Sequence, residues 1–531
     1  MVNSVSRETV NLKKKYDVVV VGGGHAGIEA ALAATRLGLQ VALITMDASS
    51  IGRMSCNPAI GGLAKGHLVR EIDALGGQMG CLADAAGIQF KMLNKSKGKA
   101  VWSPRAQIDK KHYESLVSFS IQSRPNLDII EGEARKVLTK NGFVCGVAID
   151  RETTISCRSL VLTCGTFLNG VVHIGRRKIC AGRMGEEASG GITESLISLG
   201  FTSGRLKTGT PPRLRSKSID WEKVEEVFGD KNPRPFSFRT TSFNPPNIPC
   251  HITNTNSITH EIILGSLSVS PLYCNEIEGV GPRYCPSIEE KVVRFSERGS
   301  HHLFLEPEWA GSDQIYTNGF STSLPEGVQL KALRTVPGLK NVSLYRPGYA
   351  IEYDFFLPSQ LKASLETKAV HGLFFAGQIN GTSGYEEAAA QGLLAGINAA
   401  MHFLGSEPLV LQRNEAYLGV LIDDLVTKET LEPYRMFTAR AEYRLLLRHT
   451  NADLRLSPTS YKIGLLNEFL LSAVTKKQDF LSREIKKLRQ CRPGLESINS
   501  FLSSLGEPHT TEKISLADVL RRPPVGLRTL A

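Results

Sequence analysis

The chain has 531 residues and a mass of 58.0 kDa, and its 63 Lys and Arg against 52 Asp and Glu give a formal net charge of +11. This length accommodates about three or four domains, and a composition of 41% hydrophobic and 22% charged residues excludes a mostly disordered or fibrous chain. No apolar run reaches the length of a bilayer span, the polar N-terminus lacks a signal-peptide core, and the ten cysteines show no CxxC or zinc-ligand spacing. We therefore expect a cytoplasmic protein with no membrane segment, metal site or disulfide framework, and nucleic acid is one candidate partner for its positive charge.

A βαβ unit follows the first polar residues. Residues 16–21 form a continuous β-branched run of the kind that is buried on both faces in a parallel sheet. The Gly-rich turn at residues 22–27 leads into an Ala-rich helix expected over residues 28–37, and residues 40–45 form the second strand.

The turn between this strand and helix carries the pattern G-x-G-x-x-G. Its first glycine permits a tight turn, its second lets the backbone approach a pyrophosphate, and its third lets helix and strand pack closely. The alternative is a Gly-rich turn without a ligand, but the strand-to-helix context favours a dinucleotide site. The second strand ends in a threonine where an acidic residue usually holds the ribose, and a hydroxyl can make the same hydrogen bond. We therefore assign cofactor contacts to Gly22, Gly23, Gly24, His25, Ala26, Gly27 and Thr45.

Two later strands complete the expected nucleotide-binding sheet. Residues 159–163 lead into a Cys-Gly-Thr turn, and residues 372–376 lead into a second Gly-rich turn that begins with Gly377 and Gln378. A late strand that ends in glycine and a polar residue is typical of two-part flavoprotein sheets, so we expect FAD rather than NAD at this site. The long separation of the two strands indicates an inserted domain.

The expected fold is α/β with three regions. An FAD-binding Rossmann-like domain of the glutathione-reductase type is discontinuous, over residues 16–205 and 340–405. Residues 206–339, rich in Pro, Ser, Thr and Asn, predict an inserted β-rich α+β domain. Beyond residue 405 glycine becomes rare and Leu, Arg, Glu and Lys dominate, which predicts a helical domain over residues 406–531.

Several long and unusual strings are spread over most of the chain. Besides the first glycine turn they are MSCNPAIGG at 54–62, RLKTGTPPR at 205–213, EGVGPRYCPS at 278–287, RPGYAIEYD at 346–354, FAGQINGTSGYEE at 375–387 and EPYRMFTARAEYR at 432–444. In these strings the chain resembles the GidA/MnmG flavoprotein family, the bacterial tRNA uridine 5-carboxymethylaminomethyl modification enzymes.

The resemblance implies a homodimeric FAD enzyme that acts on the wobble uridine of certain tRNAs. It also implies methylenetetrahydrofolate as one-carbon donor, NADH as flavin reductant, and a GTPase partner in a heterotetramer. The resemblance assigns NAD binding to residues 206–339 and contacts with tRNA and the partner to residues 406–531. Relatives extend further at the C-terminus in what looks like a partner-docking helical module. Because this chain ends at Ala531, we expect either that the sequence is truncated or that this module is missing, and docking of the GTPase on this chain stays open. Further cofactor contacts implied by the resemblance are Ala134 and Ser189, with Gly281, Pro282 and Arg283 for NADH.

Two cysteines lie inside the matched strings, Cys56 and Cys285. A thiolate that adds to C6 of uracil activates C5, and a neighbouring cation such as Arg283 favours the thiolate of Cys285. The alternative for each is the role of a small buried hydrophobe, which is usual for a free cysteine. We take Cys56 and Cys285 as candidate catalytic residues and assign that ordinary role to Cys81, Cys145, Cys157, Cys164, Cys180, Cys250, Cys274 and Cys491.

Arginines at four-residue spacing predict an RNA-binding surface. Residues 406–531 hold 19 Lys and Arg against 15 Asp and Glu, so overall charge does not single out this region. Local spacing is more informative, because arginines four residues apart form one stripe on a helix, and a second basic loop lies at residues 205–213. The alternative is a solvated helix face paired with glutamates. Our candidate tRNA contacts are Arg205, Lys207, Arg213, Arg435, Arg440, Arg444 and Arg448.

Three rival functions are open. A folate- and FAD-dependent tRNA uridine-54 methyltransferase is the nearest, although that family looks shorter and lacks a long helical tail. A small-molecule flavin oxidoreductase gives no reason for the arginines. A flavin-loaded RNA-binding scaffold without turnover of its own is the rival from another class.

Overall fold

The computed structural model describes residues 15–150, 153–274, 276–281, 286–428 and 432–530. The chain divides into two compact units, Met1–Leu465 and Leu466–Ala531. The domain limits expected from the sequence stay predictions. None of the helices in these described ranges has the length and apolar character that a bilayer span requires.

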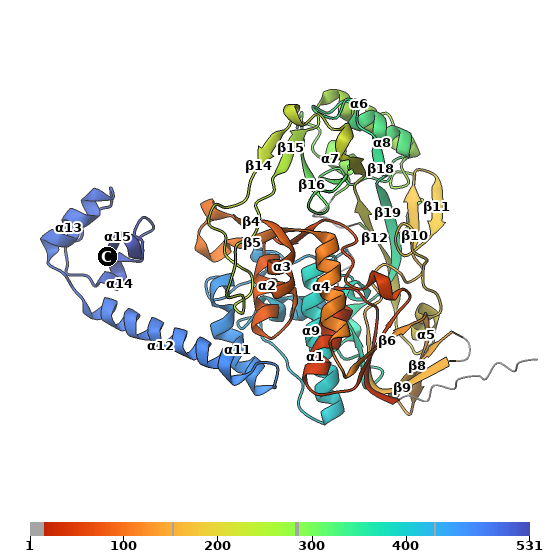
Figure 1. The fold of residues 1–531 in the computed structure, drawn as a ribbon, viewed down its shortest axis with the longest axis horizontal. Helices are drawn as coiled ribbons and strands as arrows, with labels where there is room; N and C mark the ends of the chain where they lie inside the picture. Colours follow the sequence, from red (N-terminus) through yellow and green to blue (C-terminus); the bar gives the residue numbers. More distant parts are fainter. Residues whose placement is uncertain (1–14, 151–152, 275, 282–285, 429–431, 531) are drawn as a thin grey trace, which may run out of the picture. The chain divides into compact units, whose positions relative to one another are not determined.

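The predicted βαβ unit is confirmed, as β1 (Lys15–Val21), α1 (His25–Arg36) and β2 (Val41–Thr45). β1 lies parallel to β2 on one side and to β9 (Thr153–Leu162) on the other. The sheet continues beyond β2 to β6 (Leu127–Glu131), and the end of β9 runs parallel to β20 (Leu373–Phe375). The two later strands therefore join the first βαβ unit in one sheet, which gives the expected Rossmann-like arrangement. Figure 1 labels β6 and β9 of this sheet and the helix α1 near it. An antiparallel hairpin, β7 (Ala134–Lys140) and β8 (Phe143–Ile149), extends it at the start of β9.

Helix α9 (Tyr385–Leu404) follows β20 and packs closely against α1. Gly392 and Gly396 permit this approach, because a Cβ atom on them would lie 2.0 Å from the carbonyl oxygen of Ala26 and 2.4 Å from that of Ala30. Nearly all of α1 is buried as a result. The packing brings the glycine turn before α9 next to the glycine turn before α1.

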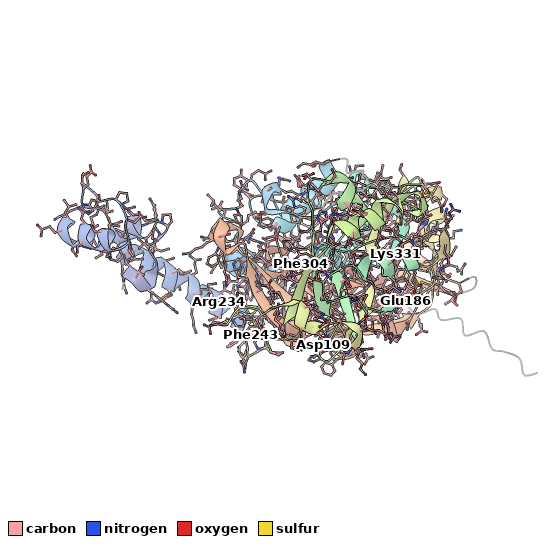
Figure 2. All side chains as sticks on the ribbon, turned by 90° about the horizontal axis from the view of Figure 1, so that it is seen from above. Asp109, Glu186, Arg234, Phe243, Phe304 and Lys331 are labelled. Carbon is pink, nitrogen blue, oxygen red and sulfur yellow. The ribbon has the colours of Figure 1, made fainter. Side chains whose placement is uncertain are left out.

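A small sheet and three helices lie beside this core. The sheet has the order β3 (Ala59–Gly61), β5 (Ser103–Ile108), β4 (Gly87–Leu93). The helices are α2 (Lys65–Ala74), α3 (Met79–Ala86) and α4 (Lys110–Gln122). Asp109, labelled in Figure 2, caps α4 by accepting from the amide of His112 at 2.9 Å, and its other oxygen accepts from the amide of Ala310 at 3.0 Å. The start of α4 is thereby tied to a segment distant in the sequence.

Two further sheets are built from strands between residues 171 and 356. A four-stranded sheet has the order β11 (Arg177–Cys180), β10 (Val171–Ile174), β19 (Tyr349–Phe356), β12 (Ser203–Thr210). A second sheet has the order β14 (Glu225–Val227), β15 (Cys250–Asn254), β16 (His302–Pro307), β17 (Gln314–Asn318), β13 (Arg213–Arg215), β18 (Leu344–Arg346). The helices of this region, with α5 on the hairpin β7–β8, are α5 (Ile192–Ser198), α6 (Ser257–Leu264), α7 (Ile288–Arg294) and α8 (Glu326–Leu333).

The tail is helical but belongs to both compact units. α10 (Tyr417–Thr427) and α11 (Ala452–Lys462) pack on α2 within the larger unit. The smaller unit has its own apolar core of Ile498, Leu502, Val519 and Val525. Its helices are α12 (Glu468–Gln490), α13 (Leu495–Ser504), α14 (Leu516–Val519) and α15 (Leu527–Leu530).

Candidate active site

A cavity of about 810 Å³ opens where the parallel strands of the main sheet end. Most of the residues that the sequence analysis selected for the cofactor line it, together with one candidate catalytic cysteine and one candidate RNA contact. These residues are Gly22, Gly23, Gly24, His25, Ala26, Thr45, Ala134, Ser189, Gly377, Gln378, Cys56 and Arg435. Twelve predicted positions from segments far apart in the sequence thus meet at one site.

The three motif glycines have different structural reasons. Gly22 has φ +109°, and a Cβ atom there would lie 2.5 Å from the carbonyl oxygen of Thr163. Gly27 lies in the first turn of α1, and a Cβ atom on it would lie 1.8 Å from the carbonyl oxygen of Gly22. The absence of a side chain there permits the close packing of helix and turn. Gly24 is the N-cap of α1, and its Cβ position has no atom within 4 Å. Space is therefore open at the residue where the motif predicts a pyrophosphate.

The N-terminus of α1 presents unused hydrogen-bond donors to this space. No side chain caps the helix and no acidic residue lies in its first turn. The first amides of a helix have no intrahelical acceptor and attract anions. Thr45, the expected ribose partner, ends β2 at the cavity wall, with its hydroxyl donating to the carbonyl of Asp47 at 3.3 Å. The donor set fits the pyrophosphate and ribose of a dinucleotide.

The second glycine turn meets the first at Gly377. This residue has φ +87°, and a Cβ atom there would lie 3.3 Å from the Cβ of Ala26. The buried side chain of Gln391 fixes the turn, since its carbonyl oxygen accepts from the Gly377 amide at 3.2 Å and from the Asn380 amide group at 2.9 Å. The neighbouring Gln378 lines the cavity.

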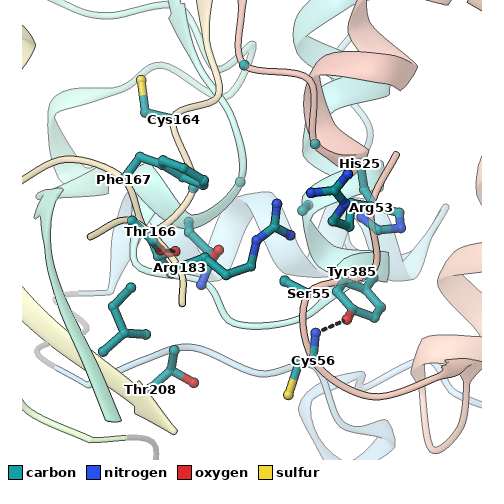
Figure 3. A pocket seen from close by; sticks show the side chains of 18 of the residues that line it. His25, Arg53, Ser55, Cys56, Cys164, Thr166, Phe167, Arg183, Thr208 and Tyr385 are labelled. Carbon is teal, nitrogen blue, oxygen red and sulfur yellow. Dashed lines mark hydrogen bonds between the residues drawn. The ribbon is translucent and has the colours of Figure 1, made fainter. Parts of the chain in front are cut away.

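Two arginines that the sequence analysis did not select extend into the cavity. Arg53 contacts Glu114 at 2.9 Å and Glu186 at 3.0 Å, and Arg183 also pairs with Glu186. Figure 3 shows Arg183 reaching toward the middle of the cavity and toward Arg53. Its buried Nε atom has no hydrogen-bond partner in the described residues. The two guanidinium groups thus share Glu186, and Arg53 is paired with Glu114 as well.

His25 is held as a neutral ring. It stacks on Tyr385 with ring centroids 4.5 Å apart and on Tyr113 at 5.7 Å. Burial lowers the pKa of His25 to about 4, against the attraction of Glu386. Lys65, at the start of α2, forms ion pairs with Glu386 at 2.9 Å and Glu387 at 3.1 Å, and these carboxylates hold its pKa above the ordinary value despite burial.

The main chain of Cys56 is bound from two sides. Its amide donates to the hydroxyl of Tyr385 at 2.6 Å, drawn as a dashed line in Figure 3. Its carbonyl accepts from Lys110 at 2.7 Å and from Arg213 at 3.3 Å. The two cations share Glu308, at 2.8 and 3.1 Å. Burial lowers the pKa of Lys110 to about 8, whereas Lys110 and Arg213 outweigh burial and keep the pKa of Glu308 below its ordinary range.

A second thiol, Cys164, also lines the cavity. Burial raises the pKa of Cys164 to about 12, so this thiol stays protonated at neutral pH. Cys56 is half-buried, and its Sγ atom lies 3.2 Å from the hydroxyl of Tyr316.

The model of the family described as glucose inhibited division protein A matches residues 17–407. The chain belongs to this GidA family. It is 54% identical over 513 residues to the tRNA uridine 5-carboxymethylaminomethyl modification enzyme MnmG of Thermodesulfovibrio yellowstonii, with 96% of this chain and 82% of that protein covered. It is 53% identical over 509 residues to the protein of the same name from Campylobacter fetus, with the same coverage.

Solved GidA structures have the same fold. GidA of Aquifex aeolicus in its form I crystal superposes with a TM-score of 0.88 at 46% identity, over 95% of this chain and 88% of that one. The form II crystal gives 0.87 at 48% identity, over 92% and 79%. The expected fold class is therefore confirmed.

Other predicted site residues of this GidA-family chain lie outside the cavity or outside the described residues. Pro282, Arg283 and Cys285 fall in the range 282–285, which the structure does not describe. Gly281 is described, and a Cβ atom on it would lie 2.3 Å from the Cε of Lys207.

The predicted basic loop is wrong in conformation, because Arg205 and Lys207 lie on β12 and Arg213 on β13. The three side chains are also paired. Arg205 contacts Asp354 at 2.6 Å, Lys207 is buried with Glu290 at 3.9 Å, and the buried Arg213 supports Cys56. Antiparallel pairing of β12 with β19 places Arg205 opposite Asp354 and Lys207 opposite Glu352.

The predicted helical arginine stripe is also wrong. Residues 438–440 form a short 3-10 helix and residues 442–446 form turns. Arg440 turns inward, 3.6 Å from Asp424 and over the ring of Tyr434 at 4.2 Å. Arg444 and Arg448 are exposed. Arg435 lines the cavity and donates to Ser383 at 3.2 Å, so this segment connects the cavity to the protein surface.

Proposed function

We propose that this chain is an FAD-dependent tRNA-modifying enzyme that adds the carboxymethylaminomethyl group at C5 of the wobble uridine. The observation that carries the proposal is one cavity shared by the two glycine turns and Cys56. The name of the Thermodesulfovibrio relative, at 54% identity, supports the same reaction.

The chemistry requires a nucleophile for the uracil ring. C5 of uracil is weakly nucleophilic, and addition of a thiolate at C6 converts the ring into an enolate that attacks a one-carbon electrophile at C5. Cys56 is the candidate nucleophile because it is half-buried at the cavity wall and its main chain is fixed on both sides. Cys285 remains the second candidate catalytic cysteine.

The FAD site is proposed from the donor set. Gly22 to Gly27 and the start of α1 hold the pyrophosphate, Thr45 holds a ribose, and the turn at Gly377 and Gln378 faces the isoalloxazine. Arg53 and Arg183 line the cavity, and the Nε of Arg183, which has no partner among the described residues, is a hydrogen-bond donor for the anionic parts of the ligands. When bound, the flavin supplies redox and one-carbon transfer chemistry.

The remaining reactants and partners are proposed from the family resemblance. They are NADH near Gly281 and α7, methylenetetrahydrofolate as carbon donor, a homodimer, and a GTPase partner. A cytoplasmic location suits these reactants.

The tRNA surface is proposed at the segment that runs outward from Arg435. Arg444 and Arg448 are exposed, and the ring of Tyr443, next to Arg444 in the chain, is 49% exposed and available for base stacking. Burial withdraws Lys207 and Arg213 from phosphate contact, so we omit them from this surface.

Reconstitution tests the function. The protein is mixed with FAD, NADH, methylenetetrahydrofolate, a GTPase partner and a tRNA transcript, and the modified nucleoside is identified by mass spectrometry. A methyl group at uridine 54 instead supports the rival methyltransferase. A chain that binds tRNA but oxidises no NADH supports the rival scaffold. Cys56→Ser is the matched variant, and wild-type modification by it contradicts the nucleophile assignment.

A further inference from the structure

Tyr316 lies against the sulfur of Cys56. It is on β17 of the insertion, 4% exposed, and its hydroxyl oxygen is 3.2 Å from the Sγ atom. Thr210 also approaches the sulfur, but at 3.9 Å its hydroxyl is a weaker partner. Tyr385, the other phenol nearby, accepts from the Cys56 amide instead of facing the thiol.

The direction of the Tyr316 hydrogen bond depends on the state of the sulfur. In the neutral pair either atom can donate. Once Cys56 loses its proton, the sulfur can only accept, and the hydroxyl of Tyr316 is then the donor. A hydrogen bond to a charged acceptor is stronger than one between neutral groups, so this contact favours the thiolate over the thiol.

Cations behind the tyrosine reinforce this preference. The guanidinium of Arg213 lies 4.9 Å from the centroid of the Tyr316 ring and the ammonium of Lys110 lies 5.8 Å from it. Both groups also bind the carbonyl oxygen of Cys56. Glu308 neutralises one of the two charges, and one positive charge remains beside the main chain of Cys56.

We infer that Tyr316 is a catalytic residue that holds the attacking sulfur of Cys56 as a thiolate by donating its phenolic O–H. The inference rests on the proposed function, in which Cys56 attacks uracil. The thiol proton passes to water, and a sulfur lone pair forms the S–C6 bond while the C5–C6 π electrons become the enolate. At the end the C5 proton passes to water and the C5–H electron pair re-forms the C5–C6 double bond. The S–C6 bond then breaks, its electron pair returns to sulfur, and the Tyr316 hydroxyl again binds the thiolate. Tyr316 keeps its own proton throughout.

The test is the pH profile of Cys56 alkylation, which requires no tRNA. FAD-loaded wild type and Tyr316→Phe are treated with iodoacetamide between pH 6 and 10, and the Cys56 peptide is quantified by mass spectrometry. Loss of a hydrogen bond to a charged acceptor lowers the thiolate-to-thiol ratio about tenfold. The profile midpoint should therefore rise by about one pH unit. Because a more basic thiolate is a better nucleophile, the alkylation rate at pH 7 should fall only about threefold.

A matched control is Tyr349→Phe. Tyr349 lines the same cavity and is buried, but its hydroxyl meets the amide of Met184 at 3.4 Å. This variant should keep the wild-type midpoint. If Tyr316→Phe unfolds, 3-fluorotyrosine at position 316 replaces it, and its more acidic phenol should move the midpoint down.

Superimposable profiles for wild type and the position-316 variant would overturn the inference. That result leaves the proposed function intact, because Cys56 could still attack without this donor. Conversely, normal tRNA modification by Cys56→Ser removes the proposed role of Cys56 whatever the alkylation profile shows. The two failures are therefore distinguishable.

Discussion

A methyl group at Gly24 separates FAD binding from folding. The backbone there, with φ −80° and ψ −177°, suits alanine, and no atom lies within 4 Å of the added Cβ. The same change at Gly27 places the methyl 1.8 Å from a backbone carbonyl oxygen and 2.9 Å from the hydroxyl oxygen of Thr163. Gly24→Ala should therefore leave the apoprotein intact, whereas Gly27→Ala should force the β1–α1 turn apart.

The expected changes in the free energy of unfolding differ in sign between the two variants. Gly→Ala at a compatible position stabilises a protein by about 0.4–1 kcal/mol through the unfolded chain, so unfolding of apo Gly24→Ala should change little or shift slightly upward. Overpacking against backbone costs about 1–3 kcal/mol, so Gly27→Ala should lower the free energy of unfolding by this amount. For FAD, a methyl between the α1 amides and the pyrophosphate removes about two charge-assisted hydrogen bonds, or about 3 kcal/mol. This loss should raise the Kd of Gly24→Ala for FAD about a hundredfold.

The assay combines two measurements on protein stripped of flavin. Urea unfolding gives the free energy of unfolding, and quenching of flavin fluorescence gives the Kd for FAD. Gly494→Ala is a matched control, because Gly494 is also an N-cap with an open Cβ position, in α13. A wild-type Kd in Gly24→Ala would refute the assignment of the α1 N-terminus as the pyrophosphate site.

Three other changes test stability, pH dependence and the RNA surface. Glu71 is fully buried and accepts the first two amides of α10 at 3.0 and 2.9 Å and a guanidinium of α11 at 2.9 Å, so Glu71→Ala should lower the free energy of unfolding by about 3 kcal/mol; a urea midpoint equal to wild type contradicts this. Burial lowers the pKa of His67 to about 3 and that of His449 to about 4. Between pH 6.5 and 4 the unfolded chain therefore binds protons that the folded chain does not. As the pH is lowered through this range, the free energy of unfolding should fall by up to about 1.4 kcal/mol per pH unit for each histidine. Urea unfolding at pH 5 and 7 should show a smaller difference for His67→Gln, and an unchanged difference opposes this source of the pH dependence. Changing exposed Arg444 and Arg448 to Glu should weaken tRNA binding and reduce its salt slope by about two, with unfolding unchanged; equal slopes in filter binding count against this surface.

The first βαβ unit is predictable because local sequence determines it. The β-branched run, the glycines at fixed offsets and the Ala-rich helix act over neighbouring residues, and Gly22 and Gly27 are required by contacts within the same unit. The position of the second glycine turn also follows, since a parallel strand must end at the same edge of the sheet.

The arginine stripe fails for a tertiary reason. In a helix the carbonyl oxygen of Arg440 accepts from the amide of residue 444, but here it accepts from the guanidinium of Arg413 at 3.1 Å. The carbonyl of Leu446 likewise accepts from the side chain of Asn451 at 2.9 Å. Side chains from other turns thus replace the helical hydrogen bonds, and four-residue spacing alone cannot reveal that.

The surroundings of Cys56 could not be predicted for a related reason. Tyr316 and Tyr385 are 260 and 329 residues away in sequence, on β17 and α9, and only tertiary packing brings them to Cys56. The strings that carry the family resemblance include Cys56 and Tyr385 but not Tyr316 or Lys110. A contact that lies outside every matched string has no sequence signal in a single chain.

The same arrangement makes Cys56 sensitive to how the insertion packs on the FAD-binding sheet. Its amide is bound by α9, its carbonyl by α4 and β13, and its sulfur by β17. Glu308 lies in the insertion and holds both cations, so displacement of the insertion removes the tyrosine and the charge balance together. Under the proposed role of Tyr316, the thiolate of Cys56 is stabilised only while the insertion packs against the main sheet. The rate of Cys56 alkylation therefore reports on the packing of the insertion as well as on the reactivity of the thiol.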